Sequence, residues 1–205
     1  MPERPFADEP VERPATSREL LFDGRIQSIV RETFDYNGET LVRDFTDHMG
    51  AVGILVMDDD DRILTIQQYR HPIRSRDWEI PAGLLDIPGE SPLTAAKREL
   101  AEEVDLEAED WFALAEIYTS PGGSNEFDRI FLARGLSPTA AAFAREGEEA
   151  DIEVRWVALD DVITAVLAGS VHNSLLIAGA LAAAAARGRG WTGLRDAELG
   201  PDSEQ

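Results

Sequence analysis

One segment of the chain, Ala51–Met57, is apolar at every position apart from a single glycine. A strand that faces water on one side alternates apolar and polar residues, so an unbroken apolar run of this length predicts a strand that is covered on both faces. The four consecutive aspartates that follow, Asp58–Asp61, lack the spaced ligands, the central glycine and the closing glutamate of an EF-hand calcium loop. We interpret them as a solvated turn.

The remaining patterns mix strands with helices. Asn37-Gly38 suits the positive φ values of a tight hairpin turn and predicts an N-terminal β-hairpin. The expected strands are residues 25–34, 40–46, 62–69, 112–118, 129–133 and 152–157. The expected helices are residues 91–104, a second that is capped by Asp160 or Asp161 and stops at Gly169, and a third that is capped by Asn173 and ends near Arg187. This order of elements predicts an α/β sandwich.

The length of 205 residues fits one globular domain with a small appendage. A core of this size needs neither a disulfide nor a structural metal, and the chain contains no cysteine. We expect a flexible N-terminal arm over residues 1–18, a β-hairpin region over 19–47, the main domain over 48–187 and a flexible C-terminal tail over 188–205.

The charge balance limits the partners. Forty acidic and nineteen basic residues give a net charge of −21, which argues against binding to nucleic acid or to an anionic bilayer. A polyanionic substrate would need metal ions and locally placed arginines. The most apolar segment, residues 175–186, is too short to cross a membrane, and residues 1–19 contain no signal-peptide pattern. We expect a soluble, cytoplasmic protein.

Residues 83–106 carry the pattern that is most informative about chemistry. Glu99, Glu102 and Glu103 stand at i, i+3 and i+4 of the predicted helix, which places three carboxylates on one face. Clustered carboxylates repel one another, whereas a hard divalent cation such as Mg²⁺ needs oxygen ligands of this kind. Exposed ligand carboxylates contribute little to stability, so we expect Glu99→Gln and Glu103→Gln to lower turnover and to leave the fold intact.

Residues around this helix complete the constellation. We expect Arg98 to point away from the carboxylate face and to pair with Glu90, which would fix the entering loop against the helix. Gly83 permits a tight path in that loop, and a backbone carbonyl of Ala82 or Gly83 could complete a metal shell.

The six residues Gly83, Glu90, Arg98, Glu99, Glu102 and Glu103 resemble the Nudix box, Gly-x5-Glu-x7-Arg-Glu-U-x-Glu-Glu-x-Gly-U, in which U is apolar. Two positions depart from it. Six residues instead of five separate Gly83 from Glu90, and Asp105 replaces the closing glycine. The extra residue leaves the ligand spacing on the helix untouched, and Asp tolerates a left-handed conformation.

The resemblance implies an α/β/α sandwich with a mixed sheet that hydrolyses a nucleoside diphosphate derivative with Mg²⁺ or Mn²⁺. Glu99 and Glu103 would hold the metal together with the Ala82 carbonyl, and Glu102 would assist catalysis. Three features are similar to the ADP-ribose pyrophosphatase group: the N-terminal hairpin, the segment Trp78–Gly83, and Pro121 with Gly122 at its distance from the box. The expected products are AMP and a sugar phosphate.

The same group implies further residue roles. Its catalytic base is similar in position to Glu148 or Glu149, and the sequence alone leaves this pair open with a slight preference for Glu149. Arg70 is placed like a phosphate-binding arginine, and a surface salt bridge is the equal alternative for it; Pro121 and Gly122 are placed like substrate-binding residues. Members are typically homodimers. The alternatives are another nucleoside diphosphate derivative (a nucleotide sugar, NADH or a diadenosine polyphosphate) or a non-catalytic ADP-ribose sensor.

Overall fold

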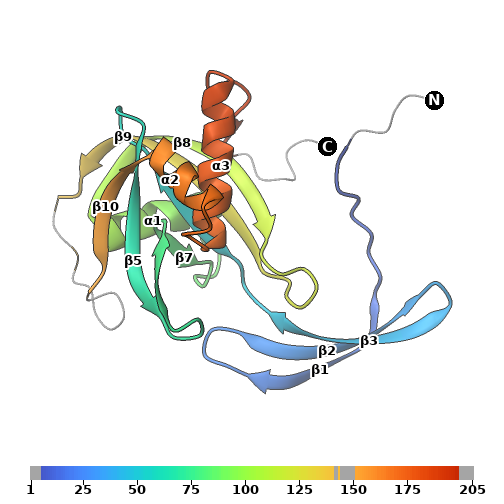
Figure 1. Cartoon of the computed structure of the whole chain (residues 1–205). Coiled ribbons are helices and arrows are strands. Elements are labelled where there is room, and N and C mark those ends of the chain that lie inside the picture. Colours follow the sequence, from blue (N-terminus) through green and yellow to red (C-terminus); the bar gives the residue numbers. More distant parts are fainter. Residues whose placement is uncertain (1–5, 141–142, 144–150, 199–205) are drawn as a thin grey trace, which may run out of the picture. The chain divides into compact units, whose positions relative to one another are not determined.

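The computed structural model describes residues 6–140, 143 and 151–198 (Figure 1). By their contacts the residues group into two units. The N-terminal unit comprises residues up to 48 together with 120–125, and the main unit comprises 49–119 together with 126 onward. The predicted flexible arm and tail fall partly outside the described residues.

The N-terminal unit is a three-stranded antiparallel sheet of β1 (Ala15–Asp23), β2 (Ser28–Tyr36) and β3 (Glu39–Asp47), in that order. The predicted hairpin joins β2 to β3, and its turn residues Asn37 and Gly38 have φ values of 52° and 82°. β1 adds a third strand that the sequence did not predict, and it begins inside the segment expected to be a flexible arm. Its register with β2 runs from Ala15 to Asp23.

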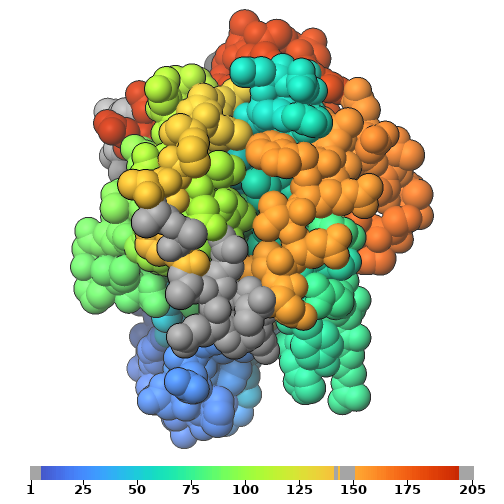
Figure 2. All heavy atoms as spheres, turned by 90° about the vertical axis from the view of Figure 1, so that its left-hand side faces the viewer, coloured from blue at the N-terminus to red at the C-terminus, as the bar shows by residue number. Residues whose placement is uncertain are grey.

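The main unit contains a mixed five-stranded sheet of order β11-β8-β9-β4-β7 and an antiparallel three-stranded sheet of order β10-β5-β6. Among the strands that the structure describes, only β4 and β9 pair in parallel. Figure 2 shows β10, in orange, beside the green-blue β5, in agreement with their pairing. The strands of the mixed sheet are β4 (Ala51–Val56), β7 (Ala82–Leu84), β8 (Leu106–Tyr118), β9 (Phe127–Pro138) and β11 (Arg195–Asp196). Those of the other sheet are β5 (Arg62–Arg70), β6 (Ser75–Glu79) and β10 (Glu153–Ala158).

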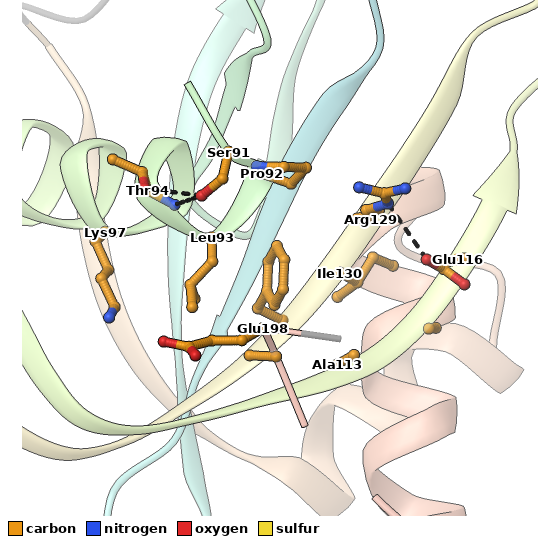
Figure 3. A pocket seen from close by; sticks show the side chains of 13 residues that line it. Ser91, Pro92, Leu93, Thr94, Lys97, Ala113, Glu116, Arg129, Ile130 and Glu198 are labelled. Atoms are coloured by element: carbon orange, nitrogen blue, oxygen red, sulfur yellow. Dashed lines mark hydrogen bonds and ion pairs between the residues drawn. The ribbon is translucent and has the colours of Figure 1, made fainter. Parts of the chain in front are cut away.

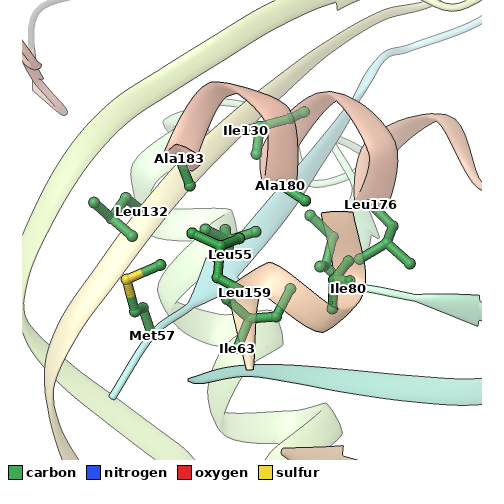
Figure 4. Packing of buried hydrophobic residues seen from close by; sticks show 11 residues of the cluster. Leu55, Met57, Ile63, Ile80, Ile130, Leu132, Leu159, Leu176, Ala180 and Ala183 are labelled. Carbon is green, nitrogen blue, oxygen red and sulfur yellow. The ribbon is translucent and has the colours of Figure 1, made fainter. Parts of the chain in front are cut away.

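All six residues of β4 are buried, as the apolar run predicts. Its side chains alternate between two cores. Ile54 and Val56 pack with Ala96 and Leu100 of α1 (Pro92–Val104), whereas Leu55 packs with residues of α2 (Leu159–Leu167) and α3 (Ser174–Gly188). Figure 4 shows this second core under α3. The predicted α/β sandwich with a mixed sheet is therefore confirmed.

The ends of the helices follow local signals. Ser91 caps α1 by accepting a hydrogen bond from the Thr94 N–H, and Asp105 ends it in the left-handed region with a φ of 57°. Asn173 caps α3 in the same way through the Leu176 N–H. The predicted cap of α2 was wrong, because Asp160 and Asp161 lie inside the first turn, where carboxylates favour the positive end of the helix dipole.

Part of the segment after α3 is ordered. β11 pairs with β8, and Trp191 and Leu194 pack against the core beneath α3. The Arg134 guanidinium lies 4.8 Å from the centre of the Trp191 ring. In the part of the chain that the structure describes, no helix is long and apolar enough to cross a membrane.

Candidate active site

The three glutamates of the Nudix-like pattern lie on α1, where it packs against β7. Their environments differ, since the Glu103 residue is 6% exposed and the side chains of Glu99 and Glu102 are 14% and 45% exposed. The expectation that the ligand carboxylates are exposed is therefore wrong for Glu103 and Glu99. Both turn toward the protein, and Glu102 stands at the water-facing edge.

Glu103 is held by the strand that precedes the helix. The backbone N–H of Ala82 donates to the Glu103 Oε2 over 3.0 Å. A buried carboxylate that accepts a backbone hydrogen bond is fixed in place. The structure therefore brings together two of the predicted metal-binding residues, with Ala82 directly beside the Glu103 carboxylate.

Glu99 lies against the next residue of the same strand. A Cβ atom placed on Gly83 would be 2.1 Å from the Glu99 Cδ and 2.2 Å from its Oε1. A side chain at this position would displace the Glu99 carboxylate, because ordinary contacts of a Cβ atom begin at about 3.4 Å. The box glycine thus leaves the room in which the Glu99 carboxylate keeps this position.

Arg98 links the carboxylates to the loop before the helix. Its Nε and Nη2 donate to the two Glu90 oxygens over 3.2 and 3.0 Å, as predicted. It does not point away from the glutamates, however, since its Nη1 donates to Glu99 over 2.5 Å and to Glu102 over 3.3 Å. Hydrogen bonding to Glu90, with the nearby Glu99 charge adding to it, raises the pKa of Arg98 above its ordinary value. Arg98 therefore offsets the repulsion between the carboxylates.

The chemical types of these residues fit a hard divalent cation. Glu99 and Glu103 supply carboxylate oxygens that lie against the same two-residue stretch of backbone, Ala82–Gly83. Within the described residues, no three His, Cys, Asp or Glu side chains are already grouped as metal ligands would be. The structure thus shows the donor types and their support by β7 and Arg98.

Arg70 forms a paired contact that the sequence did not reveal. Its Nε and Nη2 donate to the two carboxylate oxygens of Glu79, each over 2.7 Å. The Gln68 side chain donates to the same carboxylate over 3.3 Å. Glu79 is 3% exposed, and it was missed because its partner lies on the other strand of a hairpin. The only local signal is a charged residue between Trp78 and Ile80.

Asp77 and Trp78 precede Glu79 on β6 and are partly buried. Burial raises the pKa of Asp77, and the Glu79 charge adds to the effect. Trp78 is half-buried and packs against the core beneath α3.

The remaining predicted site residues lie outside the described residues or in the N-terminal unit. Glu148 and Glu149 lie outside the described residues. Pro121 and Gly122 belong to the N-terminal unit, in a loop where the N–H groups of Gly123 and Ser124 both donate to the Ser120 carbonyl. Their roles stay predictions.

A cavity of about 320 Å³ lies on the far side of α1 from the glutamates. Figure 3 shows Lys97 and Leu93 of α1 on one side of it and Arg129 of β9 on the other, with Arg129 paired to Glu116 over 3.3 Å. None of the three box glutamates lines it. This cavity is therefore separate from the predicted metal site.

Comparisons with known proteins show what the chain as a whole is similar to. The family model of the NUDIX domain matches residues 47–176. An ADP-ribose pyrophosphatase of Mycobacterium tuberculosis is 42% identical over 167 residues, which is 81% of this chain and 80% of that protein. An ADP-ribose pyrophosphatase of Bacillus subtilis is 33% identical, over 80% of this chain and 88% of that protein.

A solved structure described as an ADP compounds hydrolase has the same fold. It superposes with a TM-score of 0.72 at 19% identity, over 90% of this chain and 99% of that chain.

Proposed function

The chain belongs to the NUDIX family of hydrolases, and from this premise we propose that it hydrolyses the diphosphate of ADP-ribose, or of a related ADP-sugar, to AMP and a sugar phosphate. The observation that carries the proposal is the 42% identity to an ADP-ribose pyrophosphatase over four fifths of both chains. The local geometry supports it, because Gly83 and Arg98 hold the box glutamates as a metal-dependent hydrolase would need.

Nudix hydrolases generally need a divalent metal, and we assign Mg²⁺, or Mn²⁺ in its place. When bound, such an ion neutralises diphosphate oxygens, orients water and stabilises the leaving phosphate. Glu99 and Glu103 would hold it beside Ala82, and Glu102 would assist from the exposed edge of the site. The metal ion would thereby offset the repulsion between the anionic diphosphate and a chain whose net charge is −21.

The remaining roles fall to groups around the box. Arg70 would bind a phosphate with its planar fork, and Pro121 with Gly122 would contact the substrate. Glu148 or Glu149 would take a proton from the attacking water as the bond between one phosphorus and the bridging oxygen breaks. The adenosine half then leaves as AMP.

We also assign a homodimer. The N-terminal sheet exposes several large apolar side chains, with Leu20, Phe22 and Val42 exposed at 57%, 64% and 48%. An apolar sheet surface of this kind suits contact with a second copy of the chain. A cytoplasmic location stays a prediction of the sequence.

The direct test is incubation of the purified protein with ADP-ribose and Mg²⁺, followed by chromatographic detection of AMP. A parallel panel of a nucleotide sugar, NADH and a diadenosine polyphosphate identifies the preferred substrate. If one of these compounds is hydrolysed faster than ADP-ribose, that compound replaces ADP-ribose as the proposed substrate. Binding of ADP-ribose without AMP release under any divalent metal would instead establish a sensor.

A further inference from the structure

The short segment 79–83 contacts Arg70 and two of the three box glutamates. Its last two residues contact the box glutamates, since the Ala82 N–H donates to Glu103 and the Gly83 backbone lies against Glu99. Its first residue, Glu79, holds the guanidinium of Arg70. The segment therefore links the arginine to the two predicted metal ligands.

This segment is itself anchored. Ile80 is fully buried in the core beneath α3, and the Pro81 carbonyl accepts a hydrogen bond from the Ile54 N–H of β4 over 2.8 Å. β4 is the most buried strand of the fold. A side chain that is bound by this segment is consequently fixed in position with respect to β4.

Sheet geometry puts Arg70 and Glu79 on the α1 side. Leu64 and Ile66 of β5 pack into the core that contains α1, and Arg70 follows them at the two-residue period of a strand. Ile66 stands directly opposite Glu79 in the β5–β6 register, so the two side chains share a face. Both partners of the ion pair thus lie on the face of the sheet that carries the box helix.

The burial of the two partners is unequal. Glu79 is 3% exposed, whereas the Arg70 side chain is 43% exposed. Removing a carboxylate from water is costly, and a buried ion pair is weak evidence for stability, because an apolar pair of similar size often stabilises equally well. A bidentate contact does fix the plane of a guanidinium, which a half-exposed arginine would otherwise vary among many rotamers.

We propose that Glu79 is a positioning residue of this hydrolase: it fixes Arg70 in the orientation that binds the diphosphate, at a set distance from the box glutamates. The inference rests on the proposed function, in which Arg70 contacts a phosphate. Glu79 acts through Arg70 and does not itself touch the substrate.

A double-mutant cycle tests this. Glu79→Gln keeps the size of the side chain and loses the charge, so we expect kcat/KM for ADP-ribose to fall about 10- to 100-fold, as for a displacement of about 1 Å of a binding group. Arg70→Ala should lower it at least as much. The double variant should match Arg70→Ala within about twofold, because a group that acts through Arg70 has no effect once Arg70 is gone.

A second measurement is independent of turnover. Calorimetric titration of ADP-ribose without metal should show a weaker Kd in Glu79→Gln and no further weakening in the double variant. Glu79→Asp keeps the charge and should recover part of the affinity, and it replaces Glu79→Gln in the cycle if that variant does not fold. Glu116→Gln is the matched control, since it breaks half-buried contacts to Arg129 and Arg195 on another strand and should keep wild-type kinetics.

The outcomes separate the two proposals. Wild-type kcat/KM in Glu79→Gln, or effects that multiply in the double variant, would overturn the positioning role while the hydrolase stands. A lower melting temperature with unchanged kcat/KM would show a purely structural ion pair. A wild-type protein that neither binds nor cleaves ADP-ribose would refute the proposed function, and the role of Glu79 would fall with it.

Discussion

Replacing Gly83 by alanine should separate activity from stability. The new Cβ would lie 2.1 Å from the Glu99 Cδ and 2.3 Å from its Cγ, whereas ordinary contact begins at about 3.4 Å. The Glu99 carboxylate must therefore move by about 1.3 Å or change its rotamer. A displacement of about 1 Å in a catalytic group can cost about 100-fold in rate, and we expect kcat to fall by about that factor.

The fold should tolerate the same change. The φ of Gly83 is not in the left-handed region, and alanine is favoured over glycine within a strand by about 0.5–1 kcal/mol. The displaced group is the end of a side chain that is 14% exposed, and its charge-assisted contact with Arg98 is worth about 1.5–3 kcal/mol. The gain from alanine offsets part of this loss, so the free energy of unfolding should fall by less than about 2.5 kcal/mol.

The assay combines AMP release under saturating ADP-ribose and Mg²⁺ with urea unfolding of both proteins. Gly188→Ala is the matched control, because it is the last residue of α3 and its Cβ would meet no atom within 4 Å. It should keep full activity. Turnover of Gly83→Ala within about threefold of wild type would refute the reasoning that Glu99 must occupy that position.

Three further outcomes follow from the structure. Glu103→Gln should lower kcat by about 100-fold or more and abolish the rise in melting temperature that Mg²⁺ gives the wild type, measured by calorimetry with and without a chelator. Arg98→Ala leaves the Glu90 carboxylate, 8% exposed, without its bidentate partner and should cost about 2 kcal/mol in urea unfolding. Because burial and Glu79 raise the folded-state pKa of Asp77, its charged form disfavours the folded state above that pKa, and the penalty vanishes as the pH falls below about 4. Asp77→Asn should therefore melt at or above the wild-type temperature at pH 7, and the difference should close in acid; a lower melting temperature at pH 7 would contradict this.

Most signals that act within a few residues were read correctly from the sequence, although the cap of α2 was not. Ser91 and Asp105 bound the box helix because a capping hydroxyl and a residue that tolerates a positive φ act locally. The turn at Asn37-Gly38 is of the same kind. The extents of β8 and β9 were underestimated, because pairing between the two strands continues beyond the apolar residues from which each strand was predicted.

Within the site, too, local features could be predicted from the sequence, whereas contacts between distant segments could not. The spacing of Glu99, Glu102 and Glu103 follows from helical geometry, so the sequence was sufficient to predict it. The partner of Arg70 is set by the register of a hairpin, and the burial of Glu103 is set by the strand that packs on its helix. Neither is encoded in a local pattern.

The position of the box glutamates depends on residues outside the box helix. The three glutamates of the motif lie on α1, but Glu99 and Glu103 also lie against atoms of the segment 79–83, which has no acidic cluster and is anchored through Ile80 and Pro81. A chain could therefore keep every box glutamate and still lose activity through a change in this segment. Conversely, a second chain with the same segment should tolerate a longer loop before its box helix, as this chain does with one extra residue between Gly83 and Glu90, because the ligands are aligned by contact with the strand and not by the length of the loop.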